Sequence, residues 1–193
     1  MASPTDPSLT TTPLVIVVAD LSGYHRGFRS HSDEEMAAFL HRFYSMADHV
    51  VHSSGGRVIK FLGDAFLATY PESEVTSAIS ATVSLEVGIA RLAEDVGIDL
   101  RLGANIHAGN VVATELGTGE SRRYDVIGRA VNQTFLLGRG RGIRISERVY
   151  RKVPSGDRSP WEKNRPPTVY VLGESPEPYA SLRKTAEENA LRW

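Results

Sequence analysis

The chain has 193 residues, of which 22 are Lys or Arg, 23 are Asp or Glu and none is Cys. This length suits one domain with a full hydrophobic core, and the lack of cysteine excludes disulfides, thiolate metal sites and cysteine nucleophiles. Because the charges nearly balance, composition gives no reason to expect nucleic acid or an anionic membrane as a partner. No apolar run approaches the roughly 20 residues of a membrane span, so none is expected and the predicted location is the cytoplasm.

The first segment, residues 1–13, is polar and rich in Pro and Thr, with neither the basic start nor the apolar centre of a signal peptide. It is predicted to be a disordered leader. A folded domain is expected over residues 14–175 and a tail over 176–193. The domain begins with "LVIVVAD" (14–20), a β-branched run that is apolar on both faces and predicts a central strand.

A helix and a hairpin are expected next. Ser32 followed three residues later by Glu35 forms a capping box, and apolar residues at helical spacing continue to "SSGG". The stretch "VIKFLGDAFLATY" predicts a hairpin that turns at Gly63-Asp64. A second helix is expected from about residue 73 to residue 93.

The second half of the chain predicts mainly strands. "LRLGANIHAGNVVATEL" indicates two strands broken near Ala108-Gly109, and "RRYDVIGRAVNQ" indicates a strand, a turn and a short helix. "IRIS" and "TVYVL" (168–172) predict two further strands. The order β-α-β-β-α-β up to about residue 107 favours an α+β fold with a ferredoxin-like core, an antiparallel sheet with helices on one face, extended by further strands and a short helix.

Two carboxylates are expected at one end of this sheet. Asp20 ends the central strand, and Asp64 stands at the tip of the hairpin that pairs beside it. Two carboxylates in one place repel each other unless a cation lies between them, and hard oxygen ligands suit Mg²⁺ or Mn²⁺ with a phosphate-bearing substrate. Ser22 and Gly23 leave backbone N–H groups free for phosphate oxygens. The alternative is that Asp20 caps a loop and Asp64 is a turn residue.

Four segments in order resemble the class III adenylate/guanylate cyclase catalytic domain: "VVADLSGYHRGF", "GGRVIKFLGDAFLATY", "LRLGANIHAGNVVATELG" and "RRYDVIGRAVNQ". The resemblance covers roughly residues 14–172. It implies conversion of ATP to cyclic AMP and pyrophosphate with two Mg²⁺ or Mn²⁺ ions per site. It also implies a homodimer in which each chain contributes half of each site.

The resemblance implies a role for each matching residue. Asp20 and Asp64 match the metal-binding aspartates, and Leu21 matches a backbone-carbonyl ligand. Lys60 and Asp125 match the pair that reads the purine. An ammonium can donate to N1 of adenine and a carboxylate can accept from its amino group, whereas guanine inverts this pattern. The remaining assignments are Asn132 for the ribose and Ser22, Gly23, Tyr24 and Lys163 for the phosphates.

The chain departs from the family pattern at Leu136. Four residues after the asparagine the family carries an arginine that stabilises the transition state, and the glycines of "GRGRG" end the helix early here. Arg139 or Arg141 is the candidate substitute. Losing one such donor costs on the order of 10²–10³ in rate.

Three functions are therefore open. The first is an active but slow adenylate cyclase, and the second is a catalytically weak nucleotide-binding regulatory module. The third, a polymerase or diguanylate cyclase, is disfavoured because the chain has no G-G-D/E-E-F segment and no basic surface for a template. The sequence identifies neither an activating signal nor a regulatory partner.

Overall fold

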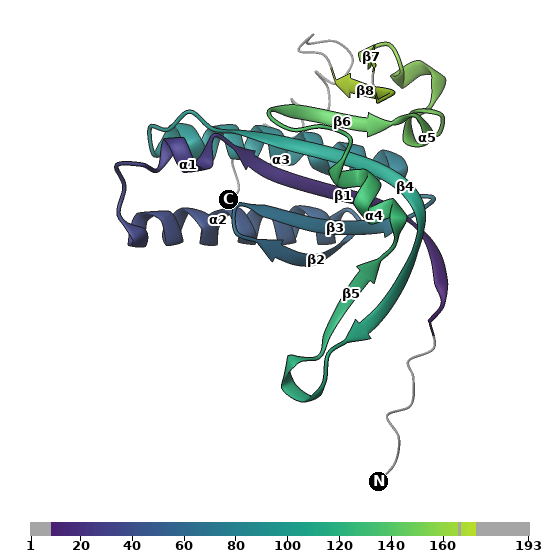
Figure 1. Ribbon diagram of the computed structural model, residues 1–193. Coiled ribbons are helices and arrows are strands. Elements are labelled where there is room, and N and C mark those ends of the chain that lie inside the picture. Colours follow the sequence, from purple (N-terminus) through teal and green to yellow (C-terminus); the bar gives the residue numbers. More distant parts are fainter. Residues whose placement is uncertain (1–8, 166, 173–193) are drawn as a thin grey trace.

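The computed structural model of this chain describes residues 9–165 and 167–172, and Figure 1 shows how its elements are arranged. The predicted tail and residues 1–8 of the predicted leader lie outside this part. The strands are β1 (Thr11–Ser22), β2 (Arg57–Leu62), β3 (Ala65–Pro71), β4 (Arg101–Leu116), β5 (Arg123–Ile127), β6 (Gly142–Ser146), β7 (Trp161–Asn164) and β8 (Val169–Leu172). The helices are α1 (Tyr24–Gly27), α2 (Asp33–Ser53), α3 (Val75–Asp95), α4 (Arg129–Phe135) and α5 (Glu147–Tyr150), with 3₁₀ turns η1 (Gly119–Ser121) and η2 (Ser155–Asp157). β1 thus begins inside the segment predicted as leader.

Within the described residues, eight strands form one sheet in the order β2-β3-β1-β4-β6-β8-β7, with β5 paired to β4 outside this path. β1 lies between β3 and β4 and pairs antiparallel with both, as predicted for the βαββαβ unit. The whole sheet is mixed, however, because β4 and β6 pair in parallel from Gly103↔Gly142 to Ile106↔Ile145. The chain reaches β6 through β5 and α4, a crossover long enough to restore the direction of β4.

β4 is one continuous strand, so the predicted break near Ala108 and Gly109 is wrong. Gly109 is the point where α4 comes close to the sheet. A β-carbon on Gly109 would lie 2.6 Å from the Cβ of Ala130, which is too short for two carbon atoms. The glycine therefore permits a close approach of helix and strand instead of ending the strand.

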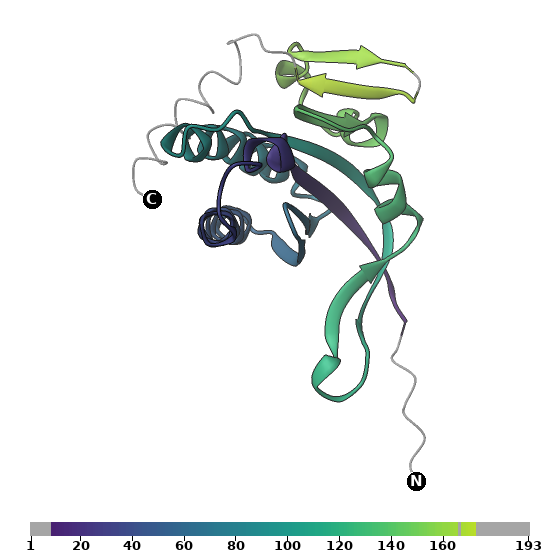
Figure 2. The same ribbon diagram turned by 60° about the vertical axis from the view of Figure 1, so that its left-hand side comes forward.

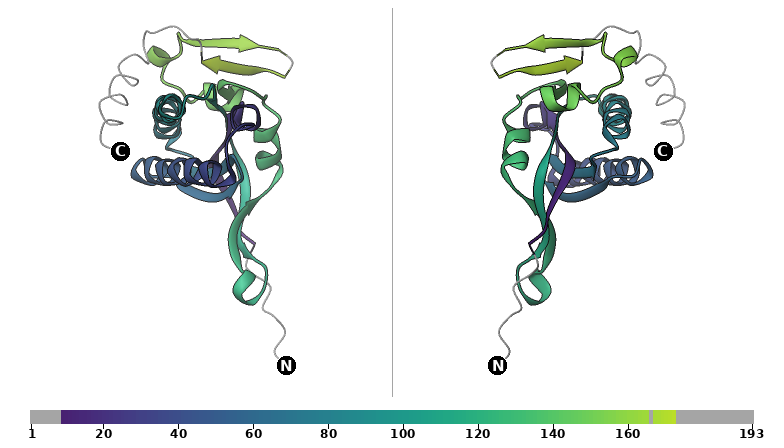
Figure 3. Two further views of the ribbon diagram at one scale, coloured as in Figure 1. Left: turned by 90° about the vertical axis from the view of Figure 1, so that its left-hand side faces the viewer. Right: turned by 90° about the vertical axis from the view of Figure 1, so that its right-hand side faces the viewer.

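Different helices cover the two faces of the sheet, as the turned views in Figures 2 and 3 show. α2 and α3 bury the larger core, to which β1 contributes Val15 and Val17. α4 covers part of the other face, where Ile16 and Val18 meet Ala130. Successive side chains of a strand point to opposite faces, so the run predicted to be central supplies both cores. The expectation of helices on one face holds for the βαββαβ unit, and α4 lies outside that unit.

α2 begins with the predicted capping box. The Glu35 N–H donates to Ser32 Oγ at 3.2 Å, and the Ser32 N–H donates to Glu35 Oε2 at 2.8 Å. α3 differs from the expectation that no apolar run approaches the length of a membrane span. Among the described residues it is the one helix long and apolar enough to cross a membrane by length and composition, and 56% of its apolar window is buried in the domain. Such burial against β4 and α2 is typical of a core helix.

β2 carries a bulge. Val58 pairs with Ala68, but the next pair along is Lys60 with Leu67, so Ile59 is an additional residue without a partner on β3. Leu67 belongs to the core beneath α4. The bulge therefore places Lys60 on the same face of the sheet as α4.

Candidate functional site

Asp20 lies near the end of β1, on the face that α4 covers. Ile16 and Val18 belong to the core on that face, and strand alternation places Asp20 with them. Its Cα partners are Ala65 on β3 and Gly103 on β4. The carboxylate is thus flanked by a strand on each side.

Asp64 lies at the tip of the hairpin, and hydrogen bonds hold this tip against the body of the domain. The Leu21 N–H donates to the Asp64 carbonyl at 2.9 Å, and the Tyr44 hydroxyl donates to the Gly63 carbonyl at 2.6 Å. Gly63 has a φ of 66°, which favours glycine. The predicted turn is confirmed, and it brings Asp64 beside the end of β1.

The electrostatics of this end favour a bound cation. Burial raises the pKa of Asp20, and the Asp64 carboxylate raises that pKa further, while the Arg144 and Arg139 guanidinium groups act in the opposite direction. A nearby divalent cation would stabilise both carboxylates in their charged form. Their oxygens, with the carbonyl of Leu21, are of the hard type that Mg²⁺ and Mn²⁺ prefer.

The coordination would be completed by the substrate. The described residues contain no group of three or more His, Cys, Asp or Glu side chains that could hold a metal. Magnesium is commonly bound by one or two carboxylates together with substrate phosphates and water. The two-aspartate end fits this pattern, and no all-protein cage is needed.

The segment predicted to bind phosphate follows directly. Ser22 ends β1, and Gly23 precedes α1 with a φ of 97°. The ring of Tyr24 lies 4.8 Å from that of Phe28, and its buried hydroxyl has no hydrogen-bond partner among the described residues. The Tyr24 side chain packs against the larger core, and burial raises the pKa of its hydroxyl, which the nearby Asp64 carboxylate raises further.

Lys60 and Asp125 are joined directly. The Lys60 Nζ donates to Asp125 Oδ2 at 2.6 Å, and the side chains are 40% and 23% exposed. Asp125 Oδ1 also accepts from the Val126 N–H at 2.8 Å, which fixes the orientation of the carboxylate. The arm formed by the far end of β4 and by β5 extends from the body in Figure 1 and brings Asp125 to β2.

The Lys60–Asp125 pair lines a cavity of about 560 Å³ together with Asn132 of α4. Leu67, Val131 and Phe135 supply apolar walls to the same cavity. Apolar walls with a few convergent polar groups, at this volume, are typical of small-molecule sites. We call this space the base cavity, and it is lined by Lys60 together with Asp125 and Asn132, two residues that lie far from Lys60 in the sequence.

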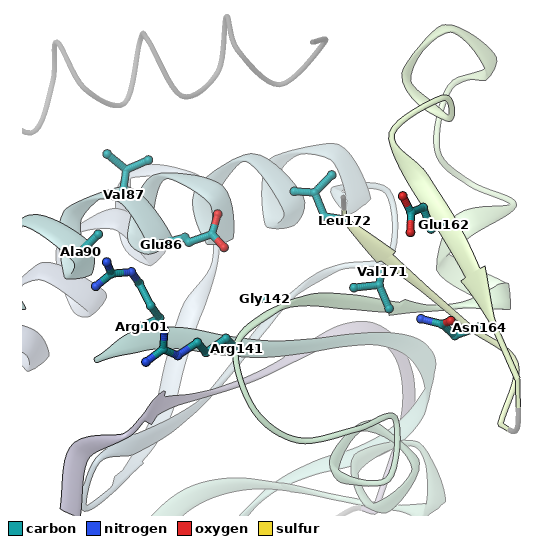
Figure 4. Close-up of a pocket in the computed structure, with 10 residues that line it drawn as sticks. All are labelled: Glu86, Val87, Ala90, Arg101, Arg141, Gly142, Glu162, Asn164, Val171 and Leu172. Carbon is teal, nitrogen blue, oxygen red and sulfur yellow. The ribbon is translucent and has the colours of Figure 1, made fainter. Parts of the chain in front are cut away.

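The two candidate arginines point to different places. Arg141 Nη2 donates to Asp99 Oδ2 at 2.7 Å, and Arg141 lines a second cavity of about 720 Å³ beside Arg101 and α3. Figure 4 shows Arg141 next to Arg101 in that cavity. The second cavity lies on the α3 side of the sheet, whereas Arg139 acts electrostatically on Asp20. Arg141 is therefore held by Asp99 at a distance from the predicted site, whereas Arg139 lies close enough to Asp20 to influence its charge.

Leu136 and Lys163 lie at the edges of the predicted site. α4 ends at Phe135, so the early end of this helix is confirmed, and Leu136 is 73% exposed as its C-terminal cap. Lys163 lies on β7, with β4, β6 and β8 between it and β1, and its Nζ stands 5.6 Å above the ring of Tyr170. The described contacts do not bring Lys163 to the aspartates.

Sequence reasoning missed Arg144 and Asn105. Arg144 of β6 pairs with Asn105 of β4, and both side chains lie on the face of Asp20. Ile143 and Ile145 are fully buried on the opposite face. The signal was present in "IRIS", because a charge between two buried isoleucines marks the other face of a strand.

The fold and this distribution of residues agree with one known family. The family model described as the adenylate and guanylate cyclase catalytic domain matches residues 8–176. The chain belongs to this class III cyclase family. The cyclase domain superposes on the guanylyl cyclase Cya2 with a TM-score of 0.74 and 23% identity, over 89% of this chain and 96% of that one. It superposes on the adenylyl cyclase CyaB from P. aeruginosa with a TM-score of 0.75 and 15% identity, over 87% and 97%.

Similar sequences include both named cyclases and uncharacterised proteins. An adenylate cyclase of Anabaena cylindrica is 23% identical over 157 residues, 75% of this chain and 31% of the relative. An uncharacterised protein of Mycobacterium tuberculosis is 31% identical over 126 residues, 64% and 22% respectively. This chain thus spans less than a third of these relatives. The family model establishes a nucleotide cyclase domain, and the base stays open because the similar structures include both adenylyl and guanylyl cyclases.

Proposed function

We propose that this cyclase domain converts ATP to cyclic AMP and pyrophosphate. The observation that carries the proposal is the Lys60–Asp125 pair in the base cavity beside Asn132. The ammonium can donate to N1 of adenine, and the carboxylate can accept from the exocyclic amine. Guanine presents a donor at N1 and an acceptor at C6, which leaves both groups mismatched, and a site built on hydrogen bonds rejects such a base strongly.

Asp20, Asp64 and the Leu21 carbonyl would hold the divalent metals, which would supply Lewis-acid stabilisation of the phosphoryl charge and a lower pKa for the ribose hydroxyl. Asn132 would hold the ribose so that its 3′-oxygen faces the α-phosphorus. The bond from the 3′-oxygen to the α-phosphorus forms as the bond from the α-phosphorus to the oxygen that bridges to the β-phosphate breaks; the hydroxyl proton passes to solvent and pyrophosphate leaves. Alignment of these atoms is the main contribution of the protein residues.

A homodimer with shared sites is part of the proposal. Leu62, Ile127 and Phe135 line the base cavity and are all exposed, and exposed Leu136 follows Phe135. Exposed apolar side chains gathered around one cavity are typical of an interface. A second copy of the chain placed over this rim would bring its own Asp20 and Asp64 to the base cavity.

The test is product formation by the purified domain. With ATP and Mn²⁺, cyclic AMP and pyrophosphate should appear in equal amounts, and Asp20→Ala or Asp64→Ala should abolish both while the circular dichroism spectrum stays unchanged. Product that persists in both variants would rule out the two-aspartate site.

A nucleotide-binding module with little turnover is the second candidate. The exposed, apolar Leu136 favours it, because this side chain offers no donor to the charge that develops in the transition state. Tight binding of ATP without cyclic AMP, under conditions where Asp20→Ala weakens binding, would identify the module.

A further inference from the structure

The loop from Gly138 to Gly142, which we call the glycine–arginine loop, is held to the sheet by two side chains. The Asn105 Nδ2 donates to the Gly138 carbonyl at 2.9 Å. Arg144 Nη1 donates to the carbonyls of Gly140 at 3.0 Å and Gly142 at 3.2 Å, and its Nη2 donates to that of Arg141 at 2.9 Å. One guanidinium thus binds three of the five carbonyls of this loop, which gives the loop a defined path.

That path runs beside Asp20. A β-carbon on Gly103 would meet both the Gly140 carbonyl and, at 2.8 Å, Asp20 Oδ1, so the loop and the carboxylate cover the same glycine. Gly138 is packed as tightly on Arg144, since a β-carbon there would lie 2.6 Å from its Cδ. The glycine–arginine loop is therefore fitted against the metal end of the site and not against the base cavity.

The loop leaves one cation available at this end. Arg141 is committed to Asp99, and Arg144 is committed to the loop carbonyls. Arg139 precedes both of them in the sequence, is exposed, and forms no hydrogen bond or ion pair with any other described residue. Its guanidinium has five donors in a fixed fork, a geometry that suits phosphate oxygens.

We propose that Arg139 binds the polyphosphate of the nucleotide whose metals are held by Asp20 of the same chain, and that Arg144 is the positioning residue that presents it. The inference rests on the proposed function and deepens it. Arg139 then does not take the place of the missing helix arginine, which would act from the chain that supplies Asn132. It acts from the opposite side of the shared site.

The first test measures binding alone, on the full chain. Inorganic triphosphate with Mg²⁺ is titrated calorimetrically into wild type, Arg139→Ala and, as the matched control, Arg141→Ala. The expected result is at least a tenfold loss of affinity for Arg139→Ala and less than a twofold change for Arg141→Ala. Equal affinity in wild type and Arg139→Ala would overturn the proposal, whether or not the domain makes cyclic AMP.

The second test determines which chain supplies Arg139. A heterodimer of Lys60→Ala and Asp64→Ala chains has one intact site, with its aspartates from the Lys60→Ala chain. Adding Arg139→Ala to the Lys60→Ala chain should lower kcat/KM at least tenfold, and adding it to the Asp64→Ala chain should leave kcat/KM unchanged. The reverse pattern would overturn the same-chain assignment. An inactive parent heterodimer would instead count against the shared site of the proposed function, and the binding test would still decide the role of Arg139.

The third test separates positioning from charge at Arg144. Lysine keeps the charge but cannot bind three carbonyls with one planar group. Arg144→Lys should therefore lose triphosphate affinity as Arg139→Ala does, and the double variant should lose little more than either alone. Wild-type affinity in Arg144→Lys, or fully additive losses, would show that Arg144 does not act through Arg139. Melting temperatures identify any variant whose loss reflects unfolding.

Discussion

Lys60 and Asp125 are 65 positions apart in the sequence and are bonded to each other at 2.6 Å between Nζ and Oδ2. Each group thus satisfies the other within one chain. Under the proposed function, a purine that enters between them would have to replace this charged hydrogen bond with bonds of its own. Only a base with the matching donor and acceptor compensates fully, because an unmatched buried group keeps its desolvation cost of about 1–3 kcal/mol.

Base choice should therefore depend on this pair. We expect the wild-type domain to prefer ATP over GTP, and Lys60→Glu combined with Asp125→Cys to erode the ratio of kcat/KM values by at least tenfold. The measurement is initial rate against concentration for both nucleotides. Equal kcat/KM values for ATP and GTP in the unmodified domain would refute the adenine assignment.

Asp20 should lower the stability of the metal-free fold. Its folded pKa lies above the unfolded value of 3.8, so its favourable contribution is present below that value and is lost as pH rises through the folded pKa. At pH 7 the charged carboxylate therefore destabilises the fold. Asp20→Asn should raise the melting temperature in EDTA by a few degrees, since about 1 kcal/mol corresponds to about 2–4 °C in a domain of this size.

The control for that measurement is Asp48→Asn on the exposed side of α2. It should leave the melting temperature in EDTA within a degree of wild type. Adding Mn²⁺ with ATP should stabilise the wild type more than Asp20→Asn. A lower melting temperature for Asp20→Asn in EDTA would mean that the carboxylate makes favourable contacts that outweigh its burial.

Leu136→Arg should raise kcat about tenfold with little change in KM. Leu136 is 73% exposed at the C-terminal cap of α4, so an arginine fits there without disturbing the core and suits a helix C-terminus. A donor that meets charge only in the transition state changes kcat more than binding. Leu136→Gln separates charge from polarity, and an unchanged kcat in Leu136→Arg would show that this position does not face the α-phosphate.

His107 should make the free energy of unfolding depend on pH. Burial lowers the pKa of His107, and Arg148 lowers it further, while a hydrogen bond to Gln133 of α4 opposes them. The unfolded chain then takes up a proton first, so stability falls as pH drops below about 6.5. The urea midpoint of wild type should fall between pH 7.5 and pH 5.5, and His107→Gln should reduce that fall. The same substitution at exposed His25 should not.

Structural features were predictable from the sequence wherever residues close together in the sequence determine them. The capping box at Ser32 and the turn at Gly63-Asp64 depend on residues within a few positions of each other, and both are present. The β-branched run of β1 predicted a strand buried on both faces, because no polar residue interrupts its alternation. These features need no knowledge of the rest of the fold.

Features that depend on distant segments were not predictable. In the sequence Gly109 suggests a strand break, and only the folded structure shows that α4 packs closely against it. The parallel pairing of β4 with β6 depends on the path of the crossover between them. Arg144 binds carbonyls of a loop whose path depends on three glycines with positive φ. The engagement of Arg141 with Asp99 likewise follows only from the folded positions of β4 and β6.

Because β2 has a bulge at Ile59, the side chain that β2 presents to the base cavity depends on the number of residues in the strand. Without the bulge, Ile59 would pair with Leu67 and Lys60 with Phe66, which places Lys60 on the side of the larger core. Deletion of one residue between Lys60 and the turn, absorbed by loss of the bulge, would thus put an apolar group in place of the ammonium in the cavity and direct a charge toward apolar side chains. Attempts to redesign this cavity by grafting hairpins between cyclases must therefore preserve strand length here, since the register determines which side chain reaches the cavity.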